Sequence, residues 1–193
     1  MTYVWKDNID DWQAQVLKGT ILGGSSLVKA KTCRSCYLSM RGKDGRWVDY
    51  KSQELNFLLP QNPYHIEKNG YFRWHSRCSP LLNDYHGMFY KDGKRFVDAE
   101  VLNGLRDIGL AVWYLDAGSI KKGRVRIGTT LLGEDGTKTV NQYFMELDLV
   151  SEIVVTSVCG GFCVSLDEKS TERFLRVIGG VVPEFMSYCL AEK

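Results

Sequence analysis

The stretch VLKGTILGGSSLVKA, residues 16–30, has the apolar character of a helix and yet contains three glycines. A glycine in a helix interior costs roughly 1 kcal/mol relative to alanine. Gly19 and Gly23 are four residues apart, so they share one helix face, and without side chains there a second helix can pack unusually close. Gly24 has a simpler alternative interpretation as the residue that ends the helix.

A second stretch, LAVWYLDAGSI at residues 110–120, has the same form half a chain later. Each stretch is an apolar helix end followed by small residues and then a strand pattern. Around them the order helix, strands, helix, hairpin, helix occurs twice, each time over about half of the 193 residues. A repeat of this length implies two related half-domains, which we place at residues 1–95 and 96–193.

The individual elements follow from periodicity and turn signals. In the first half we expect a helix at 8–23, a strand pair at 32–41 and 46–50 around the turn GKDG, and a short helix at 51–59. A hairpin around Asn69-Gly70 at 63–77, a helix at 80–90 and a polar connection at 91–96 should follow. In the second half we expect one or two helices at 97–118, a strand at 123–132 and a helix at 137–150. A hairpin at 152–167 and a closing helix at 168–182 should complete it.

The composition narrows the class of protein. Hydrophobic residues make up 44% of the chain, enough for a core, but no run of eighteen apolar residues suggests a membrane span. The N-terminal residues lack a signal peptide's apolar stretch. We therefore expect a soluble intracellular protein, from the cytoplasm of a bacterium or phage-infected cell or from an organelle, and neither secreted nor bound to a membrane.

The six cysteines allow two interpretations. Cys33 with Cys36, and Cys159 with Cys163, have spacings compatible with zinc. Both pairs, however, lie in strand-like or turn segments, and a chain with a real core does not need disulfides. We favour buried, reduced thiols over a four-cysteine zinc site.

The paired stretches resemble the motifs of the LAGLIDADG homing endonucleases, and two motifs in one chain resemble the monomeric, pseudo-symmetric branch of that family. The resemblance implies an α+β fold: two half-domains with saddle-shaped antiparallel sheets, packed through the paired motif helices, with Gly19 and Gly23 in that interface. It also implies a site-specific endonuclease that binds a long asymmetric duplex and hydrolyses both strands with Mg²⁺. The tip of each motif helix would bring one metal-binding acid to a scissile phosphate.

The chain departs from the family pattern at those acids. The eighth motif position is Gly24 in the first motif and Ala117 in the second, and neither side chain can bind a metal. Asp116 is acidic, but it occupies the seventh position, and a helix turns about 100° per residue, so it points elsewhere. Two-metal hydrolysis needs carboxylates on both sides. We therefore predict that the chain binds DNA and cleaves it very poorly or not at all.

Two origins of this loss stay open at the level of the sequence. The chain is either an active enzyme that was deliberately disabled at both acids, or a natural relative that lost cleavage. A natural non-cleaving relative would be a DNA-binding regulator or a maturase that binds intron RNA. The resemblance also implies a basic residue before the second motif, for which Lys94 is the candidate.

The surface that would contact DNA is predicted from charge and strand alternation. Alternate residues of a strand lie about 6.6 Å apart, close to two base-pair steps, and arginine suits guanine edges. In YFRWHSR and GRVRIGTT the basic residues alternate with apolar ones and have no acids beside them. Residues 29–46 add a basic excess in a chain whose net charge is only +2. The candidate DNA-contacting residues are Lys29, Lys31, Arg34, Arg41, Lys43, Arg46, Arg73, His75, Arg77, Arg124 and Arg126.

Overall fold

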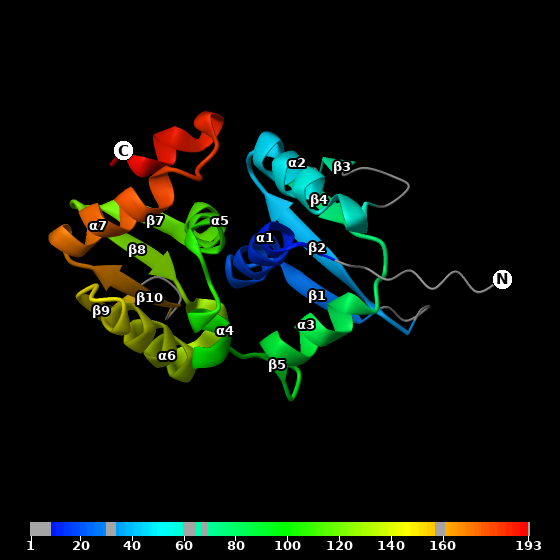
Figure 1. Ribbon diagram of the computed structural model, residues 1–193, viewed down its shortest axis with the longest axis horizontal. Coiled ribbons are helices and arrows are strands. Elements are labelled where there is room, and N and C mark those ends of the chain that lie inside the picture. The colour runs from blue at the N-terminus through cyan, green and yellow to red at the C-terminus, as the bar shows by residue number, and fades with distance from the viewer. Residues whose placement is uncertain (1–8, 30–33, 60–64, 67–68, 157–160, 193) are drawn as a thin grey trace.

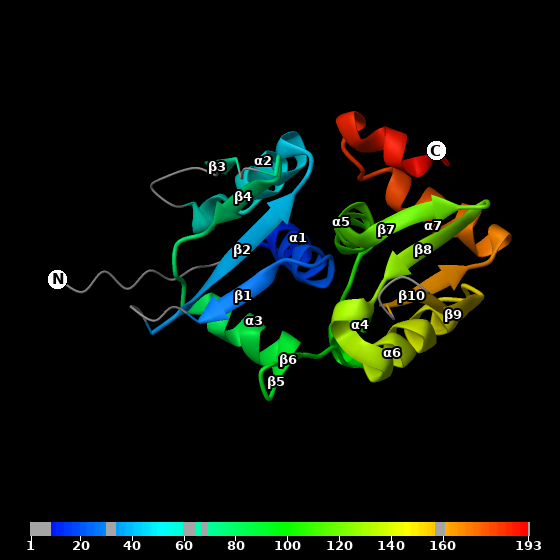
Figure 2. The same ribbon diagram turned by 180° about the vertical axis from the view of Figure 1, so that it is seen from behind.

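The computed structural model describes residues 9–29, 34–59, 65–66, 69–156 and 161–192. Two helices lie side by side at its centre, with a four-stranded sheet on either side of them (Figures 1 and 2). They are α1 (Asp11–Leu22) and α5 (Asp107–Ala117), which we call the motif helices. Within the described ranges, every helix is too short or too polar to cross a bilayer.

The first half of the chain forms one antiparallel sheet in the strand order β1-β2-β4-β3. Helices α2 and α3 pack on one of its faces, where Leu38, Met40 and Trp74 are buried. After α1, the elements of this half are β1 (Ser26–Lys29), β2 (Cys36–Gly42), α2 (Gly45–Glu54), the 3-10 helix η1 (Asn56–Leu58), β3 (His65–Ile66), β4 (Phe72–His75) and α3 (Leu81–Phe89).

The second half repeats this arrangement. Its sheet has the order β7-β8-β10-β9, which matches the first sheet strand for strand, and its pairs are also antiparallel. After α5, its elements are β7 (Gly118–Lys121), β8 (Arg124–Gly128), the 3-10 helix η2 (Thr130–Leu132), α6 (Gly133–Glu146), β9 (Ser151–Thr156), β10 (Gly161–Leu166), α7 (Glu168–Gly179) and the 3-10 segment η3 (Glu184–Leu190). The predicted α+β fold of two pseudo-symmetric halves is confirmed.

A short segment connects the two halves. It consists of the hairpin β5 (Tyr90–Lys91) and β6 (Lys94–Arg95), followed by α4 (Ala99–Asn103). The prediction that residues 91–96 form a plain polar connection was wrong, because Lys91 pairs with Lys94 in a short hairpin. Asp92 and Gly93 both have positive φ, 51° and 75°, which is the conformation of a tight two-residue hairpin turn.

The predicted strand at residues 46–50 was also wrong, because α2 begins at Gly45. The Asp44 carboxylate accepts a hydrogen bond from the Arg46 backbone N–H at 2.9 Å and caps this helix. We interpreted GKDG as a hairpin turn, although aspartate is also a strong helix N-cap. The strand that pairs with β2 on this side is β1, which directly follows the first motif helix.

The thiols only partly follow the prediction. Cys36 and Cys163 are buried and free, and burial raises the pKa of both thiols. Cys78, however, is disulfide-bonded, so the expectation that all six cysteines are reduced was wrong. Cys33 and Cys159 lie outside the described residues, and the remainder of the chain contains no group of three potential metal ligands.

Candidate nucleic-acid interface

The motif helices run parallel and pack through glycine. A side-chain carbon at Gly19 would lie 2.4 Å from the Gly109 carbonyl oxygen and 2.8 Å from Cβ of Val112. One turn later, a side-chain carbon at Gly23 would lie 2.3 Å from Cβ of Asp116. Distances below 3 Å leave no room for a methyl group, so the glycines permit a backbone separation that no other residue allows. The contact brings both helix tips to the same end of the molecule.

Polar contacts extend this interface toward the start of the helices. The Gln15 side chain donates to the Gly104 carbonyl and accepts from the Arg106 backbone N–H, both at 2.8 Å. Gln15 of the first half therefore provides the hydrogen-bond partner for backbone groups just before α5 in the second half. Further out, Arg106 and Asp11 form an exposed ion pair at 2.8 Å. The apolar residues beside them, including Leu17 and Val112, are completely buried.

The tip of α1 ends in a glycine stop. Gly24 has φ +120°, which L side chains rarely adopt. The Ser25 backbone N–H donates to the Thr20 carbonyl at 3.1 Å, and the Gly24 N–H donates to the Ile21 carbonyl at 3.2 Å. This hydrogen-bond pair is the Schellman motif, with Gly24 at the position where glycine is favoured. Gly24, the position at which the resemblance implies the first acid, thus ends the helix.

Arg95 binds the carbonyls at this tip. Its guanidinium donates to the Ile21 carbonyl at 2.6 Å and to the Gly24 carbonyl at 3.2 Å, and it also contacts the Ser25 carbonyl. Burial lowers the pKa of Arg95 from its ordinary value, with a smaller opposing effect from Tyr90. A cation at the C-terminal end of a helix offsets its partial negative charge. Lys94, the residue proposed from the sequence, is exposed on β6 instead.

The tip of α5 carries Ala117 as its last helical residue, followed by Gly118 with an ordinary φ of −97°. Glycine is needed at 118 because a side-chain carbon there would lie 2.2 Å from the Tyr114 ring. Ala117 borders a cavity of about 260 Å³ that is also lined by Leu22 and Thr129. Ala117, the position at which the resemblance implies the second acid, therefore has helical backbone and borders free volume.

Asp116 is held by the opposite half. Lys51 Nζ lies 2.6 Å from Oδ2 and 2.7 Å from Oδ1, and Trp47 Nε1 donates to Oδ1 at 2.6 Å. The Lys51 side chain is 2% exposed and that of Asp116 is 12% exposed. Burial raises the pKa of Asp116, and the nearby ammonium and indole N–H partly oppose that shift. Both carboxylate oxygens are thus already occupied by protein donors.

These tips do not fit a divalent metal. Gly24 and Ala117 offer no side-chain oxygen, and the oxygens of Asp116 face Lys51 and Trp47. Mg²⁺ prefers near-octahedral oxygen coordination, normally with one or two carboxylates. Positions 24 and 117 therefore supply no carboxylate at the two helix tips.

The open face of the first sheet carries basic and polar side chains. In β4 Trp74 is buried while Arg73 and His75 are half-buried, and Ser76, directly after the strand, is buried on the same side as Trp74. Phe72, predicted on the buried side, is only half-buried. Arg41 of β2 lies opposite Arg73 in the ladder, and its guanidinium stands 4.1 Å from the centre of the Tyr71 ring. The two arginines therefore share the face that the helices leave uncovered.

The open face of the second sheet shows the same alternation, with one difference from the prediction. Val125 and Ile127 are completely buried, whereas Arg124 and Arg126 point to the other side. Contrary to the expectation of a face without acids, Glu152 pairs with Arg124 at 2.8 Å. Ser165 lies opposite Arg126 in the ladder. Oγ of Ser165 and Nε of Arg126 are both buried without a hydrogen-bond partner in the protein.

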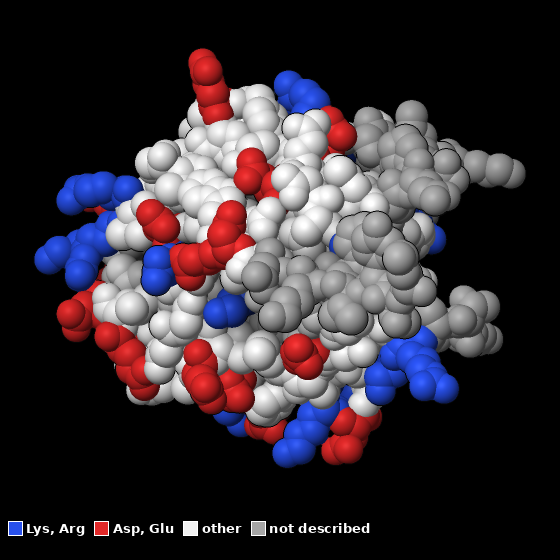
Figure 3. Space-filling model, turned by 45° about the vertical axis from the view of Figure 1, so that its right-hand side comes forward, with Lys and Arg blue, Asp and Glu red and all other residues white. Residues whose placement is uncertain are grey.

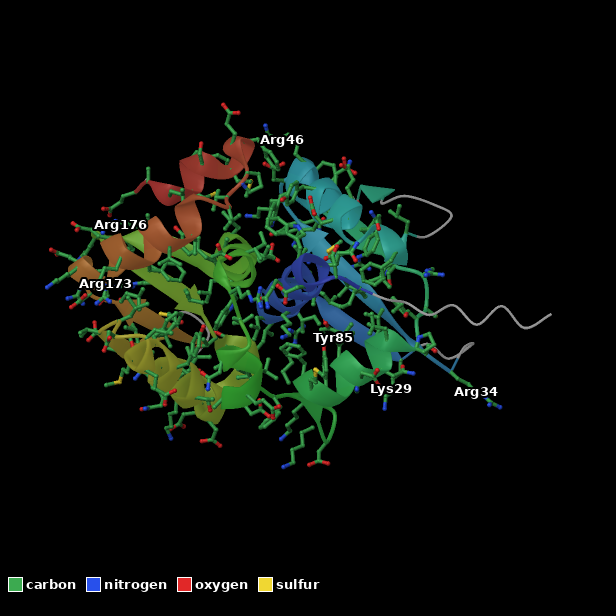
Figure 4. All side chains as sticks on the ribbon, viewed as in Figure 1. Lys29, Arg34, Arg46, Tyr85, Arg173 and Arg176 are labelled. Carbon is green, nitrogen blue, oxygen red and sulfur yellow. The ribbon has the colours of Figure 1, made fainter. Side chains whose placement is uncertain are left out.

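The structure distributes the other sequence candidates more widely. Lys29 and Arg34 lie at the outer end of β1 and β2, as the labelled side chains in Figure 4 show. Lys43 and Arg46 follow β2, and Arg46 is paired with Asp44 at 3.0 Å. Arg77 lies beyond β4 and donates to the Phe57 carbonyl. Lys31 lies outside the described residues.

The face of the molecule drawn in Figure 3 carries charges of both signs. In the view of Figure 3, acidic and basic side chains are interspersed, and many of the acidic ones lie along the lower half. A nucleic-acid surface requires an excess of Lys and Arg over one region. The open sheet faces carry Arg41, Arg73, Arg124 and Arg126, with Glu152 paired to Arg124.

Sequence reasoning missed the residues that hold the tips. Trp47 lay in a segment predicted as a strand, whereas Lys51 was predicted as helical but in a separate helix that begins at residue 51. Arg95 was passed over for its neighbour Lys94. A helix assignment for 45–54 would have placed Trp47 and Lys51 four residues apart on one face. Nothing local indicates that this face meets Asp116, because that contact spans 65 residues for Lys51.

Comparison with solved structures identifies the class of protein that this fold defines. The homing endonuclease I-WcaI, solved bound to its DNA recognition sequence, superposes with a TM-score of 0.84 at 15% identity, covering 96% of this chain and 88% of that one. I-DmoI in complex with DNA and Mn gives a TM-score of 0.60 at 15% identity, covering 90% and 99%. WhiA from Thermatoga maritima gives 0.61 at 14% identity, covering 94% and 61%. The fold is that of single-chain proteins with two motif helices.

The sequence itself matches the LAGLIDADG DNA endonuclease family over residues 14–174, and the chain therefore belongs to that family. Among curated proteins it is similar to Protein RecA of Mycolicibacterium fallax, with 23% identity over 88% of this chain and 44% of that protein. It is also similar to Protein RecA of Mycolicibacterium flavescens, with 26% identity over 58% and 27%. The chain thus spans less than half the length of these relatives.

Proposed function

We propose that this protein binds a specific, long and asymmetric site in double-stranded DNA as a monomer and does not cleave it. The proposal rests on the lack of a free carboxylate at positions 24, 116 and 117, at the ends of the two motif helices. Gly24 and Ala117 occupy the positions where the resemblance places the family's metal-binding acids, and Asp116 forms an ion pair with Lys51. The chain would be a nuclease by descent that has kept only the binding function.

The sheet faces support duplex DNA as the partner. Two open sheets flank the parallel motif helices, so that both faces can follow one groove of a continuous duplex. Their side chains differ: Arg73 and His75 lie on the first face, and Arg124 and Arg126 on the second. Different side chains on the two halves imply different base preferences, because each arginine or histidine has its own hydrogen-bond pattern. An asymmetric target follows from this difference.

The relatives support the same class of partner. I-WcaI and I-DmoI are described in complexes with DNA, and the I-DmoI complex also contains Mn. For an active form of this chain, Mg²⁺ or Mn²⁺ would supply Lewis-acid activation of water and phosphate. In the present sequence no residue at either tip could hold that ion, so the cofactor requirement would be lost together with cleavage.

The backbone at Gly24 fits either origin of the inactive state. With glycine at position 24 the helix end adopts φ +120° in the Schellman turn, whichever way the acid was lost. Deliberate removal and natural loss of the acid are therefore distinguished by experiment.

The test is selection of bound duplexes from a random library, followed by incubation of a supercoiled plasmid carrying the selected site with Mg²⁺ or Mn²⁺. We expect specific retention of one duplex family and no linear product. Linear product from the unaltered chain would overturn the non-cleaving assignment. Failure to retain any duplex would overturn DNA binding itself.

Two further arms separate the remaining alternatives. Competition between the selected duplex and structured intron RNA distinguishes a DNA-binding protein from an RNA maturase, and we expect the duplex to win. Plasmid cleavage by Gly24→Asp/Ala117→Asp would indicate a deliberately disabled enzyme. Continued inactivity on a tightly bound target would favour the natural binder.

A further inference from the structure

The contact between the halves at the motif tips is made by a buried ion pair that the proposed binding reaction does not use. Asp116 belongs to α5 in the second half, whereas Lys51 and Trp47 belong to α2 in the first. All three donor–acceptor distances are 2.6–2.7 Å. Asp116 also lies against Gly23, whose missing side chain lets the acid reach across α1.

Such a pair is poorly explained by stability alone. Removing two charges from water costs several kcal/mol per ion, and a well-packed apolar pair of similar volume is often as stable or more stable. A buried ion pair is instead demanding in geometry, because a misaligned charge stays unsolvated and unpaired. Buried polar pairs of this kind can fix one arrangement among several that apolar packing would tolerate.

The surrounding contacts hold the same region of α2. Phe185 of η3, which follows α7 in the second half, packs edge-on against Tyr50 with ring centres 6.0 Å apart. The η3 segment is itself attached to α5, because the Tyr114 hydroxyl donates to the Cys189 carbonyl at 2.7 Å. Figure 1 shows the C-terminal segment beside α2. Helix α2 therefore meets the second half at two places, Asp116 and Phe185.

We propose that Asp116 is a positioning residue: its ion pair with Lys51 locks the tip of α5 onto α2 and fixes the relative orientation of the two sheets. This inference rests on the proposed function for its consequence in DNA recognition, since fixed sheets fix the spacing between the two half-sites. One extra base pair would move a half-site by about 3.4 Å along the axis and rotate it by about 35°. Locked sheets cannot follow that movement.

The decisive variant is K51M/D116L, which replaces the ion pair by apolar side chains of similar length. The matched control is D11L/R106M, because Arg106 and Asp11 also join the two halves but are 69% and 57% exposed. Both variants remove one ion pair between the halves. They differ in burial and in distance from the motif tips.

The first readout needs no DNA. Spin labels attached through ketone-bearing residues at the exposed positions Gln53 on α2 and Lys169 on α7 leave the cysteines untouched. Electron–electron resonance should give a narrow distance distribution for the parent and for D11L/R106M, and a broad or displaced one for K51M/D116L. An unchanged distribution in K51M/D116L would overturn the proposal. If that variant does not fold, Lys51→Gln must show the broadening instead.

The second readout uses the selected duplex with one base pair inserted at its centre. The parent should lose at least about tenfold in affinity on this insertion, and K51M/D116L should lose clearly less. Equal losses in the two proteins would contradict the locking role. If no duplex is bound by any form, the proposed function fails, while the label distances still decide whether Asp116 positions the halves.

Discussion

Gly19 of α1 packs directly against the Gly109 carbonyl of α5, so closely that a side-chain carbon at position 19 would lie 2.4 Å from that oxygen. Three of the four residues in this contact and in the contact one turn later are glycines, namely Gly19, Gly109 and Gly23, and the fourth is Asp116. The cost of glycine in a helix is therefore offset by contact across the centre of the protein.

This relationship predicts opposite effects for two glycine-to-alanine exchanges. Gly19→Ala should lower the free energy of unfolding by about 1–3 kcal/mol, because overpacking outweighs the gain in helix propensity. The control is Gly87→Ala in α3, where a side-chain carbon meets nothing within 4 Å. That exchange should raise stability by up to about 1 kcal/mol. Urea unfolding of both variants measures the difference, and equal signs would contradict the close-packing account.

The two tips should respond differently to restored acids. Ala117→Asp places its side chain on helical backbone beside a cavity of about 260 Å³, so we expect a change in unfolding free energy of under about 1 kcal/mol. Gly24→Asp must adopt φ +120°, which should cost about 1–3 kcal/mol. Thermal and urea unfolding provide the comparison. A Gly24→Asp variant as stable as Ala117→Asp would show that the glycine stop is easily rebuilt.

Arg95 should be structurally important where its neighbour is not. Arg95→Met removes the donor to the Ile21 and Gly24 carbonyls, and a charged hydrogen bond is worth roughly 1.5–3 kcal/mol. We expect a loss of unfolding free energy of about that size. Lys94→Met, at an exposed position of the same hairpin, should stay within about 0.5 kcal/mol of the parent. Comparable losses for both would refute the assignment of Arg95 to the helix end.

Features that depend on neighbouring residues could be predicted from the sequence, whereas contacts between distant residues could not. The repeat of elements, the alternation in β4 and β8 and the glycine-lined helix could be predicted, because each depends on residues a few positions apart. The start of α2 was misassigned because Asp44 suits both a turn and a helix cap. The burial of Asp116 against Lys51 could not be predicted, since it depends on how the two halves pack.

Asp167 gives a test of pH dependence. Its carboxylate caps α7 by accepting the Ser170 backbone N–H at 2.7 Å, which is the main reason that the pKa of Asp167 lies below its ordinary value of 3.8. A lowered pKa in the folded state contributes stability above pH 3.8 that disappears as the pH falls through the folded pKa. The Tm difference between the parent and Asp167→Ala should therefore be largest near neutral pH and shrink in acid.

A non-titrating cap serves as the control for this effect. Asp167→Asn keeps a side-chain oxygen that can accept the Ser170 N–H, since asparagine also caps helices well. The Tm difference between Asp167→Asn and Asp167→Ala should stay constant across the same pH range. If it shrank in acid like that of the parent, titration of Asp167 would not be the cause.

DNA binding should depend on the open sheet faces and not on basic residues elsewhere. Arg73→Ala removes a guanidinium opposite Arg41 and should weaken binding of the selected duplex by about 1–3 kcal/mol. The control is Arg176→Ala, an exposed arginine on α7 at the outer edge of the second half (Figure 4). It should leave affinity within about twofold, because non-contacting surface charges act only through screened interactions. Fluorescence anisotropy at several fixed salt concentrations provides the affinities. A larger loss for Arg176→Ala than for Arg73→Ala would place the DNA on the helical side of the protein and would rule out the sheet faces as its binding surface.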